Sequence, residues 1–212
     1  MFTKILSKTA GQSLAVLGKQ RFFRVMYLAG GTGLALQIGH RYSYDFDFFT
    51  PQAFNEKTCI QRLSTILPDF RLERQDWRTI LGYIKDTRFS LFFYKYPLLF
   101  SPQLFEGISL AHLKDIAAMK IAALADRGIK KDFIDLYFLI HVEKVLTLGE
   151  TLELYDRKYG VLAQNKLSII KSLGYFDDAD ASEMPRMIKK VSWPAVKKFF
   201  LQEQKWVAKE FF

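Results

Sequence analysis

Residues 28–49 read LAGGTGLALQIGHRYSYDFDFF, and this stretch decides the fold. An apolar run over residues 25–29 predicts a short buried strand, and the two glycines after it predict a tight turn. Residues 32–40 have the apolar spacing of a helix, while residues 44–49 alternate polar and apolar side chains as a strand does. The sequence therefore predicts a strand, a glycine turn, a helix and a second strand in immediate succession.

The turn between the first strand and the helix is suited to a phosphate group. Gly30 and Gly31 let the backbone approach an anion closely, with N–H groups and the positive end of the helix directed at it. Thr32 adds a hydroxyl. The stretch is not a Walker loop, because no Gly-Lys-Ser/Thr follows, and it is not the Gly-x-Gly-x-x-Gly fingerprint, because position 36 is Leu. Taken alone, the two glycines fit an ordinary turn as well as a phosphate site.

Asp45 and Asp47 lie two residues apart on the second predicted strand, so both carboxylates point to one face of it. Aspartate is disfavoured inside strands. A pair on one face can hold Mg²⁺ that bridges the phosphates of a nucleoside triphosphate. The alternative is a solvated strand face. The glycine turn nearby favours a phosphate cradle beside a metal-binding pair.

A second group of charged residues follows later in the chain. Lys120 and Arg127 are seven residues apart on a predicted helix and share a face, and Asp132 and Asp135 share a face of the next helix. The two cations could neutralise a triphosphate, while an acid orients them or acts on an attacking hydroxyl. The alternative is a helix pair with weak surface ion pairs.

In this order, the two groups resemble the nucleotidyltransferase superfamily with the DNA-polymerase-β-like fold, and more narrowly the AbiEii/AbiGii toxin family of nucleotidyltransferases. The resemblance covers roughly residues 25–140. It implies an α+β fold with a polymerase-β-like nucleotidyltransferase core and a mixed sheet, followed by a C-terminal helical region. The segments that carry it are residues 28–36 (LAGGTGLAL), residues 39–49 (GHRYSYDFDFF), and Lys120, Arg127, Lys131, Asp132 and Asp135.

The resemblance also implies an activity. The implied activity is the Mg²⁺-dependent transfer of a nucleoside monophosphate from a nucleoside triphosphate to an acceptor hydroxyl, with tRNA or another RNA as one acceptor. The family implies the toxin of a toxin–antitoxin or phage-defence pair, with a cognate antitoxin protein as a partner. The implied roles are catalytic for Asp45, Asp47, Lys120, Asp132 and Asp135, metal-binding for Asp45 and Asp47, and nucleotide-binding for Gly30, Gly31, Thr32, Arg41, Ser43, Arg127 and Lys131.

The sequence departs from the superfamily pattern at a third core carboxylate. The strand expected to carry it, residues 88–95, contains no acidic residue, although Asp86 lies just before it. One metal ion held by the aspartate pair could suffice, or Asp132 could supply the extra charge. Two other functions stay open: an inactive module that binds RNA or protein, and a nucleotidyltransferase that modifies small molecules of the antibiotic type.

The chain has 212 residues, of which 31 are Lys or Arg and 22 are Asp or Glu, so its formal charge is +9. Half of the residues are hydrophobic, which excludes a disordered chain. Cys59 is the single cysteine, which excludes an internal disulfide framework and favours a reducing compartment. The basic surplus favours a polyanionic partner such as a nucleotide or RNA. No apolar stretch reaches the about 20 residues that span a membrane, so we expect a cytoplasmic protein without a membrane partner.

The remaining pattern divides the chain near Ala111. We expect an αβ nucleotidyltransferase core over residues 1–110 and a helical region over residues 111–212 that completes the active site. The charge not used at the site is expected mostly in the C-terminal helices. Further predicted elements are a helix over residues 55–67 capped by Asn55, an antiparallel meander of strands over residues 70–77, 80–85 and 88–96, and a surface loop over residues 177–185.

Overall fold

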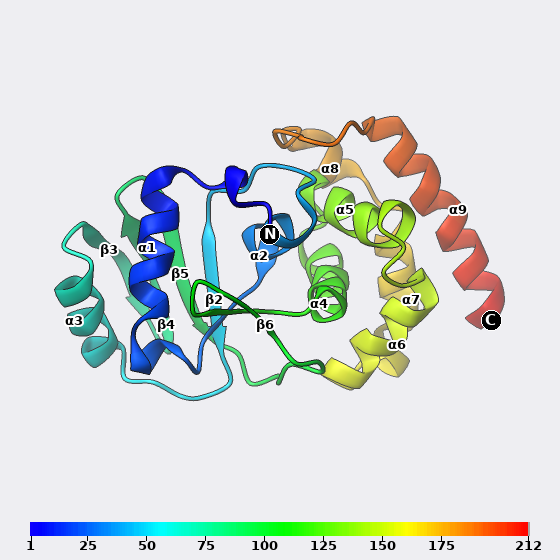
Figure 1. Cartoon of the computed structure of the whole chain (residues 1–212). Helices are drawn as coiled ribbons and strands as arrows, with labels where there is room; N and C mark the ends of the chain where they lie inside the picture. The colour runs from blue at the N-terminus through cyan, green and yellow to red at the C-terminus, as the bar shows by residue number, and fades with distance from the viewer. Residues whose placement is uncertain (212) are drawn as a thin grey trace. The chain divides into compact units, whose positions relative to one another are not determined.

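The computed structural model describes residues 1–211, apart from the side chains of residues 162, 163 and 211. The chain divides into two compact units, an N-terminal unit of residues 1–112 and a C-terminal unit of residues 113–212. The first contains a sheet and helices, and the second is helical in the part that the structure describes (Figure 1). Within residues 1–211, no helix is both long and apolar enough to cross a membrane.

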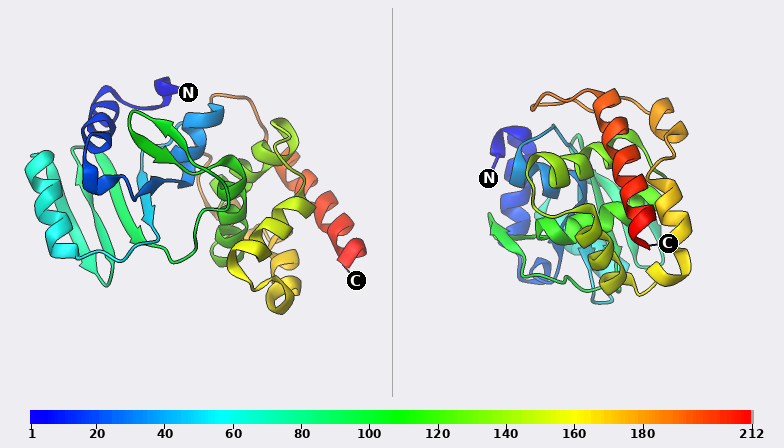
Figure 2. Two further views of the ribbon diagram at one scale, coloured as in Figure 1. Left: turned by 60° about the horizontal axis from the view of Figure 1, so that its bottom comes forward. Right: turned by 90° about the vertical axis from the view of Figure 1, so that its right-hand side faces the viewer.

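The N-terminal unit is built on a mixed sheet of seven strands in the order β3-β4-β5-β2-β1-β7-β6 (Figure 2). Strand β2 lies at its centre, antiparallel to β1 and parallel to β5, and β1 is parallel to β7. The strands β3, β4 and β5 form the predicted antiparallel meander. The strands are β1 (Tyr27–Leu28), β2 (Phe46–Thr50), β3 (Phe70–Asp76), β4 (Thr79–Ile84), β5 (Thr87–Phe93), β6 (Gln103–Phe105) and β7 (Ile108–Leu110).

The core of this unit fixes which way the acidic strand faces. Phe46 and Phe48 of β2 are fully buried and belong to one apolar cluster with Leu14 and Leu63. Because side chains alternate along a strand, Asp47 must point to the opposite face. The helices of the unit are α1 (Lys8–Gly18), α2 (Gly30–Ile38) and α3 (Glu56–Ile66), with short 3₁₀ turns at Thr3–Ile5 and Arg21–Phe23.

Stacked apolar helices form the C-terminal unit. Phe133 is fully buried, and its ring centre lies 5.1 Å from those of Phe176 and Phe200. These contacts join three segments that are distant in sequence. The helices are α4 (Leu113–Asp126), α5 (Lys130–Tyr137), the π-helix η3 (Phe138–Val142), α6 (Leu148–Tyr159), α7 (Leu162–Ser172), α8 (Asp177–Ala181) and α9 (Trp193–Phe211).

The predicted α+β fold with a mixed sheet is confirmed. The predicted cap of α3 is confirmed as well, since the Asn55 side chain accepts a hydrogen bond from the Thr58 N–H at 2.9 Å. The predicted surface loop over residues 177–185 is wrong in its first part, which forms α8. There Ala179 is buried, and the Asp180 carboxylate accepts a hydrogen bond from the Trp193 indole N–H.

The predicted location of the surplus charge is also wrong. Residues 1–112 contain 14 Lys or Arg against 8 Asp or Glu, whereas residues 113–212 contain 17 against 14. The N-terminal unit therefore carries two thirds of the net positive charge. The helical unit is close to balanced because its many lysines are matched by nearly as many acids.

Candidate active site

The start of α2 is shaped to lie against the acidic strand. Gly30 has a φ of +60°, a backbone conformation that residues with a side chain rarely adopt. A Cβ at this position would lie 2.7 Å from Oδ2 of Asp47 and 3.3 Å from its Cβ. The glycine thus lets the first turn of α2 approach the carboxylate of Asp47, which leaves no room for a side chain at this position.

Gly31 makes room for two side chains of the loop that precedes β2. A Cβ on Gly31 would collide with the Arg41 guanidinium and would lie 2.9 Å from Oγ of Ser43. Arg41 and Ser43 are both buried, and the Nη1 of Arg41 donates a hydrogen bond to the Tyr42 carbonyl at 3.0 Å. The fold therefore brings both side chains to the start of α2, next to the glycine turn.

Thr32 ties this loop to the helix. Its hydroxyl is fully buried, donates a hydrogen bond to the Asp45 carbonyl at 2.5 Å and lies 3.0 Å from Oγ of Ser43. The hydroxyl that the sequence suggested for phosphate contact is thus used inside the protein, where it fixes the backbone of Asp45. Asp45 lies just before β2, and on β2 itself the Asp47 carbonyl accepts a hydrogen bond from the Ala29 N–H at 3.1 Å.

The neighbouring strand explains the absent third carboxylate. Asp47 of β2 is paired with Ser90 of β5, and residues paired in this way have side chains on the same face of a sheet. Ser90 is buried, and neither Asp86 nor any other acid lies within β5. A hydroxyl therefore stands beside Asp47, on the strand where the superfamily pattern predicts a third acid.

Asp45 and Asp47 fit a hard divalent cation such as Mg²⁺. Both side chains are half-buried, so they keep access to solvent, and the carboxylate of Asp47 lies against the first turn of α2. Across residues 1–211, no cluster of three or more His, Cys, Asp or Glu side chains could hold a metal ion alone. Mg²⁺ is usually held by one or two carboxylates with water and substrate phosphates completing its shell, so this donor set matches a cation that arrives with a triphosphate.

The second predicted group forms one ion-pair network in the C-terminal unit. The Nζ of Lys120, on α4, lies 2.8 Å from Oδ1 of Asp132 and 2.5 Å from Oδ2 of Asp135, both on α5. The Nε of Arg127 lies 3.0 Å from Oδ2 of Asp132. The carboxylates are fully buried and Lys120 is nearly so, while the Arg127 side chain is 54% exposed. Arg127 is thus the member of the network best placed to reach a ligand.

The network keeps Asp132 ionised. Burial alone would raise the pKa of its carboxyl, but the charge of Lys120, with the hydrogen bond and charge of Arg127, outweighs burial and lowers that pKa. A buried carboxylate with two cationic partners is a weak base, and it holds the side chains of both partners in position. Lys131, on the first turn of α5, is half-buried and makes no ion pair with any residue that the structure describes.

One buried ion pair near this network has no counterpart in the sequence-based prediction. Asp115 of α4 and Lys158 of α6 are both fully buried, with Nζ of the lysine 3.0 Å from Oδ1 of the aspartate. It fixes α6 against the helix that carries Lys120. The two residues are 43 positions apart, and neither belongs to a recognisable pattern, so no local signal could have paired them.

Comparisons with known proteins agree with this geometry. The family described as nucleotidyl transferase AbiEii toxin, type IV TA system, matches residues 12–97 and 94–206. An uncharacterized protein from Aquifex aeolicus (strain VF5) is 41% identical over 182 residues, which are 84% of this chain and 86% of that protein.

Two solved structures share the fold. JHP933 from Helicobacter pylori has a TM-score of 0.58 and 18% identity, over 96% of this chain and 90% of that one. A candidate nucleotidyltransferase from H. pylori has a TM-score of 0.54 and 16% identity, over 96% and 93%. The match to the family extends over most of the chain, including the glycine turn, the aspartate pair and the buried network. The chain belongs to the nucleotidyl transferase AbiEii toxin family.

Proposed function

We propose that this protein is an enzyme that transfers a nucleoside monophosphate from a nucleoside triphosphate to an acceptor hydroxyl and releases pyrophosphate. The observation that carries the proposal is the contact between the start of α2 and Asp47. It brings the backbone N–H groups and the positive end of the helix next to the carboxylate of Asp47. Membership of a nucleotidyl transferase family supports the same reaction class.

In this reaction the acceptor oxygen attacks the α-phosphorus, and the bond from that phosphorus to the bridging oxygen of the β-phosphate breaks. Pyrophosphate leaves with the electron pair, and the acceptor loses its proton. Mg²⁺, held by Asp45 and Asp47, supplies charge neutralisation for the triphosphate when it is bound. The turn at Gly30 and Gly31 orients the phosphates, and Thr32 keeps the backbone of Asp45 in place.

The ion-pair network of the C-terminal unit has two parts in this proposal. Arg127 contacts phosphate, because its guanidinium is half-exposed while its Nε is anchored on Asp132. Lys120 positions the network, because its ammonium is enclosed by Asp132 and Asp135. The two carboxylates then orient the cations and do not accept the proton of the acceptor, which agrees with the low pKa of Asp132.

The finer assignments follow from the family and the charge. We infer that the acceptor is an RNA such as tRNA, since the surplus of positive charge suits a polyanion. The chain would then act in the cytoplasm as the toxin of a toxin–antitoxin or phage-defence pair, with an antitoxin as the cognate protein.

A transfer assay tests the reaction. Purified protein is incubated with Mg²⁺, each of the four α-labelled nucleoside triphosphates and total tRNA, with aminoglycosides as a parallel small-molecule acceptor set. We expect label on RNA with one or more nucleotides, and a loss of about 100-fold or more in Asp47→Asn and Asp45→Asn. Asp86→Asn, an exposed acid of the same unit, is the matched control and keeps full activity. Equal labelling by the wild type and Asp47→Asn would show that the aspartate pair has no part in catalysis.

One observation favours a second function, in which the site binds nucleotide without turnover. Ser90 beside Asp47 leaves two carboxylates where a third would strengthen cation binding. The second function predicts nucleotide binding that depends on Mg²⁺ and on Asp47 but no labelled product with any acceptor. Calorimetry with a non-hydrolysable triphosphate, run beside the transfer assay, separates the two.

A further inference from the structure

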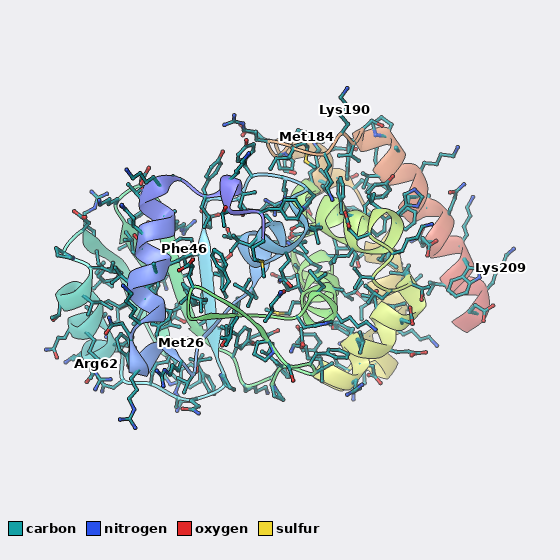
Figure 3. All side chains as sticks on the ribbon, in the orientation of Figure 1. Met26, Phe46, Arg62, Met184, Lys190 and Lys209 are labelled. Carbon is teal, nitrogen blue, oxygen red and sulfur yellow. The ribbon has the colours of Figure 1, made fainter. Side chains whose placement is uncertain are left out.

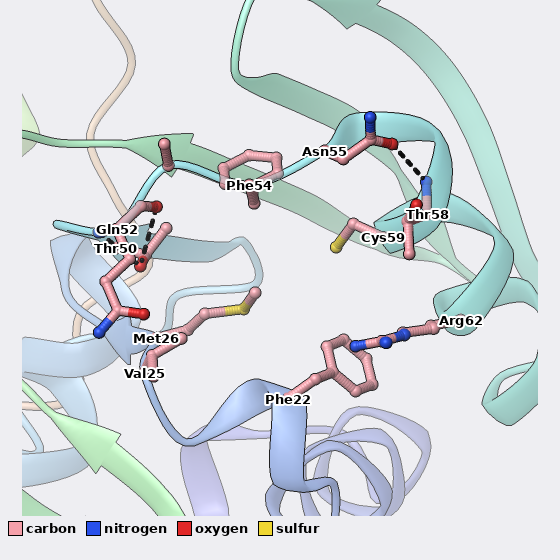
Figure 4. Close-up of a pocket in the computed structure, with 11 residues that line it drawn as sticks. Phe22, Val25, Met26, Thr50, Gln52, Phe54, Asn55, Thr58, Cys59 and Arg62 are labelled. Atoms are coloured by element: carbon pink, nitrogen blue, oxygen red, sulfur yellow. Dashed lines mark hydrogen bonds between the residues drawn. The ribbon is translucent and has the colours of Figure 1, made fainter.

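Two small apolar cavities flank one exposed segment of the N-terminal unit. Both are lined by Val25 and Met26, which lead into β1. The first holds about 170 Å³, opens to the surface and lies between the 3₁₀ turn η2 (Arg21–Phe23), the loop after β2 and the start of α3 (Figure 4). The second holds about 180 Å³, lies on the other side of the segment and includes Arg24. Val25, between them, is 42% exposed, which is unusual for a valine beside a buried strand.

The first cavity is apolar inside and cationic at its rim. In Figure 4, Met26 and Cys59 direct their sulfur atoms into the space, and Phe22 and Phe54 lie on its walls. The Arg62 guanidinium lies over the Phe22 ring, 5.4 Å from the ring centre. Pro51, Leu98 and Pro102 supply apolar walls of the second cavity.

The surrounding surface is strongly basic. Lys19, Arg21 and Arg24 are exposed on and around η2, and Arg62 is exposed on α3. None of these four side chains forms an ion pair with a residue in the described range 1–211. Glu56, on the same helix as Arg62, accepts a hydrogen bond from the Arg78 backbone N–H and keeps its negative charge. With four cations around the two cavities, positive charge still exceeds negative charge there.

This surface lies at the far end of the central strands from the candidate active site. The end of β1 that leads to Gly30 is paired beside Asp47 through the Ala29–Asp47 hydrogen bond. Met26 precedes β1 and Thr50 ends the antiparallel β2, so both lie at the opposite end. In Figure 3, Met26 and Arg62 lie toward one end of the unit and Phe46 toward the other. A molecule seated in the cavities would leave the glycine turn uncovered.

We propose that this double pocket docks an acidic segment of a partner protein that carries two apolar side chains. An apolar cavity of about 150 Å³ takes a benzene molecule, so each of the two cavities is of a size for one Leu, Met or Phe side chain. The carboxylates of the segment pair with Arg24 and Arg62 at the rim. Exposed valine, buried sulfur and aromatic walls are typical of surfaces that receive apolar anchors.

A nucleic acid fits the same surface less well. Bases bind by stacking on an accessible aromatic face. Here the Arg62 guanidinium lies over the Phe22 ring, and methionine, cysteine, threonine and amide side chains supply much of the remaining cavity lining. The positive charge is compatible with phosphates, but phosphate groups would leave the two pockets between these cations empty. The observations therefore favour a peptide.

The test uses the full-length protein and a defined peptide panel. The chain has five methionines, and Met26 alone among them lines both cavities, so ¹³C-methyl labelling of methionine gives a direct reporter. The probes are short peptides rich in Asp and Glu that carry two Leu or Phe residues at spacings of i+2, i+3 or i+4. We expect at least one spacing to shift the Met26 methyl signal, while the same peptides with Lys in place of the acids, or Ser in place of the apolar pair, do not.

Three surface variants and one control locate the binding. Arg24→Glu, Arg62→Glu and Val25→Asp each lower peptide affinity by about tenfold or more. Arg71→Glu, at an exposed position of β3, leaves it unchanged. All four positions are exposed, and thermal melting of each variant checks that the fold is kept. Binding of a non-hydrolysable nucleoside triphosphate with Mg²⁺, which the proposed function places at the glycine turn, is unaffected in all of them, so this test stands apart from that of the proposed function.

The proposal is overturned if no peptide of the panel moves the Met26 signal, or if acidic and lysine-containing peptides bind alike. It is also overturned if a single-stranded RNA oligonucleotide shifts Met26 more strongly than the peptides and loses that effect in the same variants. That result would assign the surface to nucleic acid.

Discussion

Gly30 meets two constraints that can be separated by substitution. Its φ of +60° disfavours any side chain, and its neighbour Asp47 leaves no room for one. Gly160 also has a positive φ, of +67°, but no atom lies within 4 Å of its missing Cβ, and Gly11 has open space at an ordinary helical position. Gly30 thus combines a positive φ with crowding, Gly160 has the positive φ alone, and Gly11 has neither.

We expect Gly160→Ala to cost about 1–2 kcal/mol for backbone strain alone. Gly30→Ala adds the collision with Asp47, so it should cost more and abolish nucleotide binding. Gly11→Ala should be neutral or should stabilise by about 0.5–1 kcal/mol, because alanine is the better helix former. Urea unfolding measures all three. A stability of Gly30→Ala equal to that of Gly160→Ala would show that Asp47 does not crowd the turn.

The buried Asp132 makes stability depend on pH in a defined direction. Its pKa is lowered in the folded protein from an ordinary 3.8, so its contribution is complete above that value. The contribution is lost as the pH falls through the folded pKa, because the unfolded chain binds the proton first. We expect the difference in melting temperature between the wild type and Asp132→Asn to be largest near neutral pH and to shrink below pH 3.8. Glu153→Gln, an exposed change on α6, is the control, and its difference from the wild type should not shrink in this way.

At the scale of elements, the Asp115–Lys158 pair holds α4 and α6 together without any contact with solvent. Lys158→Met leaves a buried carboxylate without its partner and should destabilise the protein by about 3–5 kcal/mol. The double variant Asp115→Leu, Lys158→Met removes both charges and should recover most of that loss. Lys85→Met, which breaks the exposed pair with Asp69, should cost less than about 1 kcal/mol. Denaturant unfolding of the four proteins measures the effect, and equal losses in the single and double variants would contradict it.

Elements with a clear period could be predicted from the sequence, and elements fixed by distant pairing could not. The α3 helix and the β3–β5 meander follow local alternation and capping. Strands β6 and β7 have three residues each, which is too short for an alternating pattern to be recognised in the sequence. The α8 helix is acidic and short, and it is stabilised by contacts of Asp180 with α9 that no local pattern records.

The candidate site likewise has features that could be predicted from the sequence and features that could not. The sequence predicts Gly30, Asp45 and Asp47 because they lie within one short stretch that turns between a strand and a helix. It could not predict that the Thr32 hydroxyl would bond the backbone of Asp45, since that depends on how the loop folds back. It also could not show that Lys120 would be buried, because burial is set by the packing of whole helices.

At the scale of the whole molecule, the positive charge lies mainly in the N-terminal unit, with 14 basic against 8 acidic residues. If RNA is the acceptor, its phosphates release counterions on binding, so affinity must fall with salt. For about four phosphate contacts on a single strand, log K should fall with log[salt] at a slope of about −3. Fluorescence anisotropy with a labelled tRNA between low and moderate salt measures the slope. A slope near zero would exclude a phosphate-dominated acceptor.

Strand β1 has two residues, yet it joins the sheet to both β2 and β7. During synthesis β2 emerges soon after β1, whereas β7 follows about 80 residues later. Until then one edge of β1 has unpaired backbone groups, and the Ala111 N–H cannot yet reach the Leu28 carbonyl that it finally contacts at 2.9 Å. The glycine turn directly after β1 therefore acquires its final geometry only when almost the whole N-terminal unit has left the ribosome. Incomplete nascent chains should thus carry no assembled catalytic centre. Activity is expected only in chains from which β7 and Ala111 have already emerged.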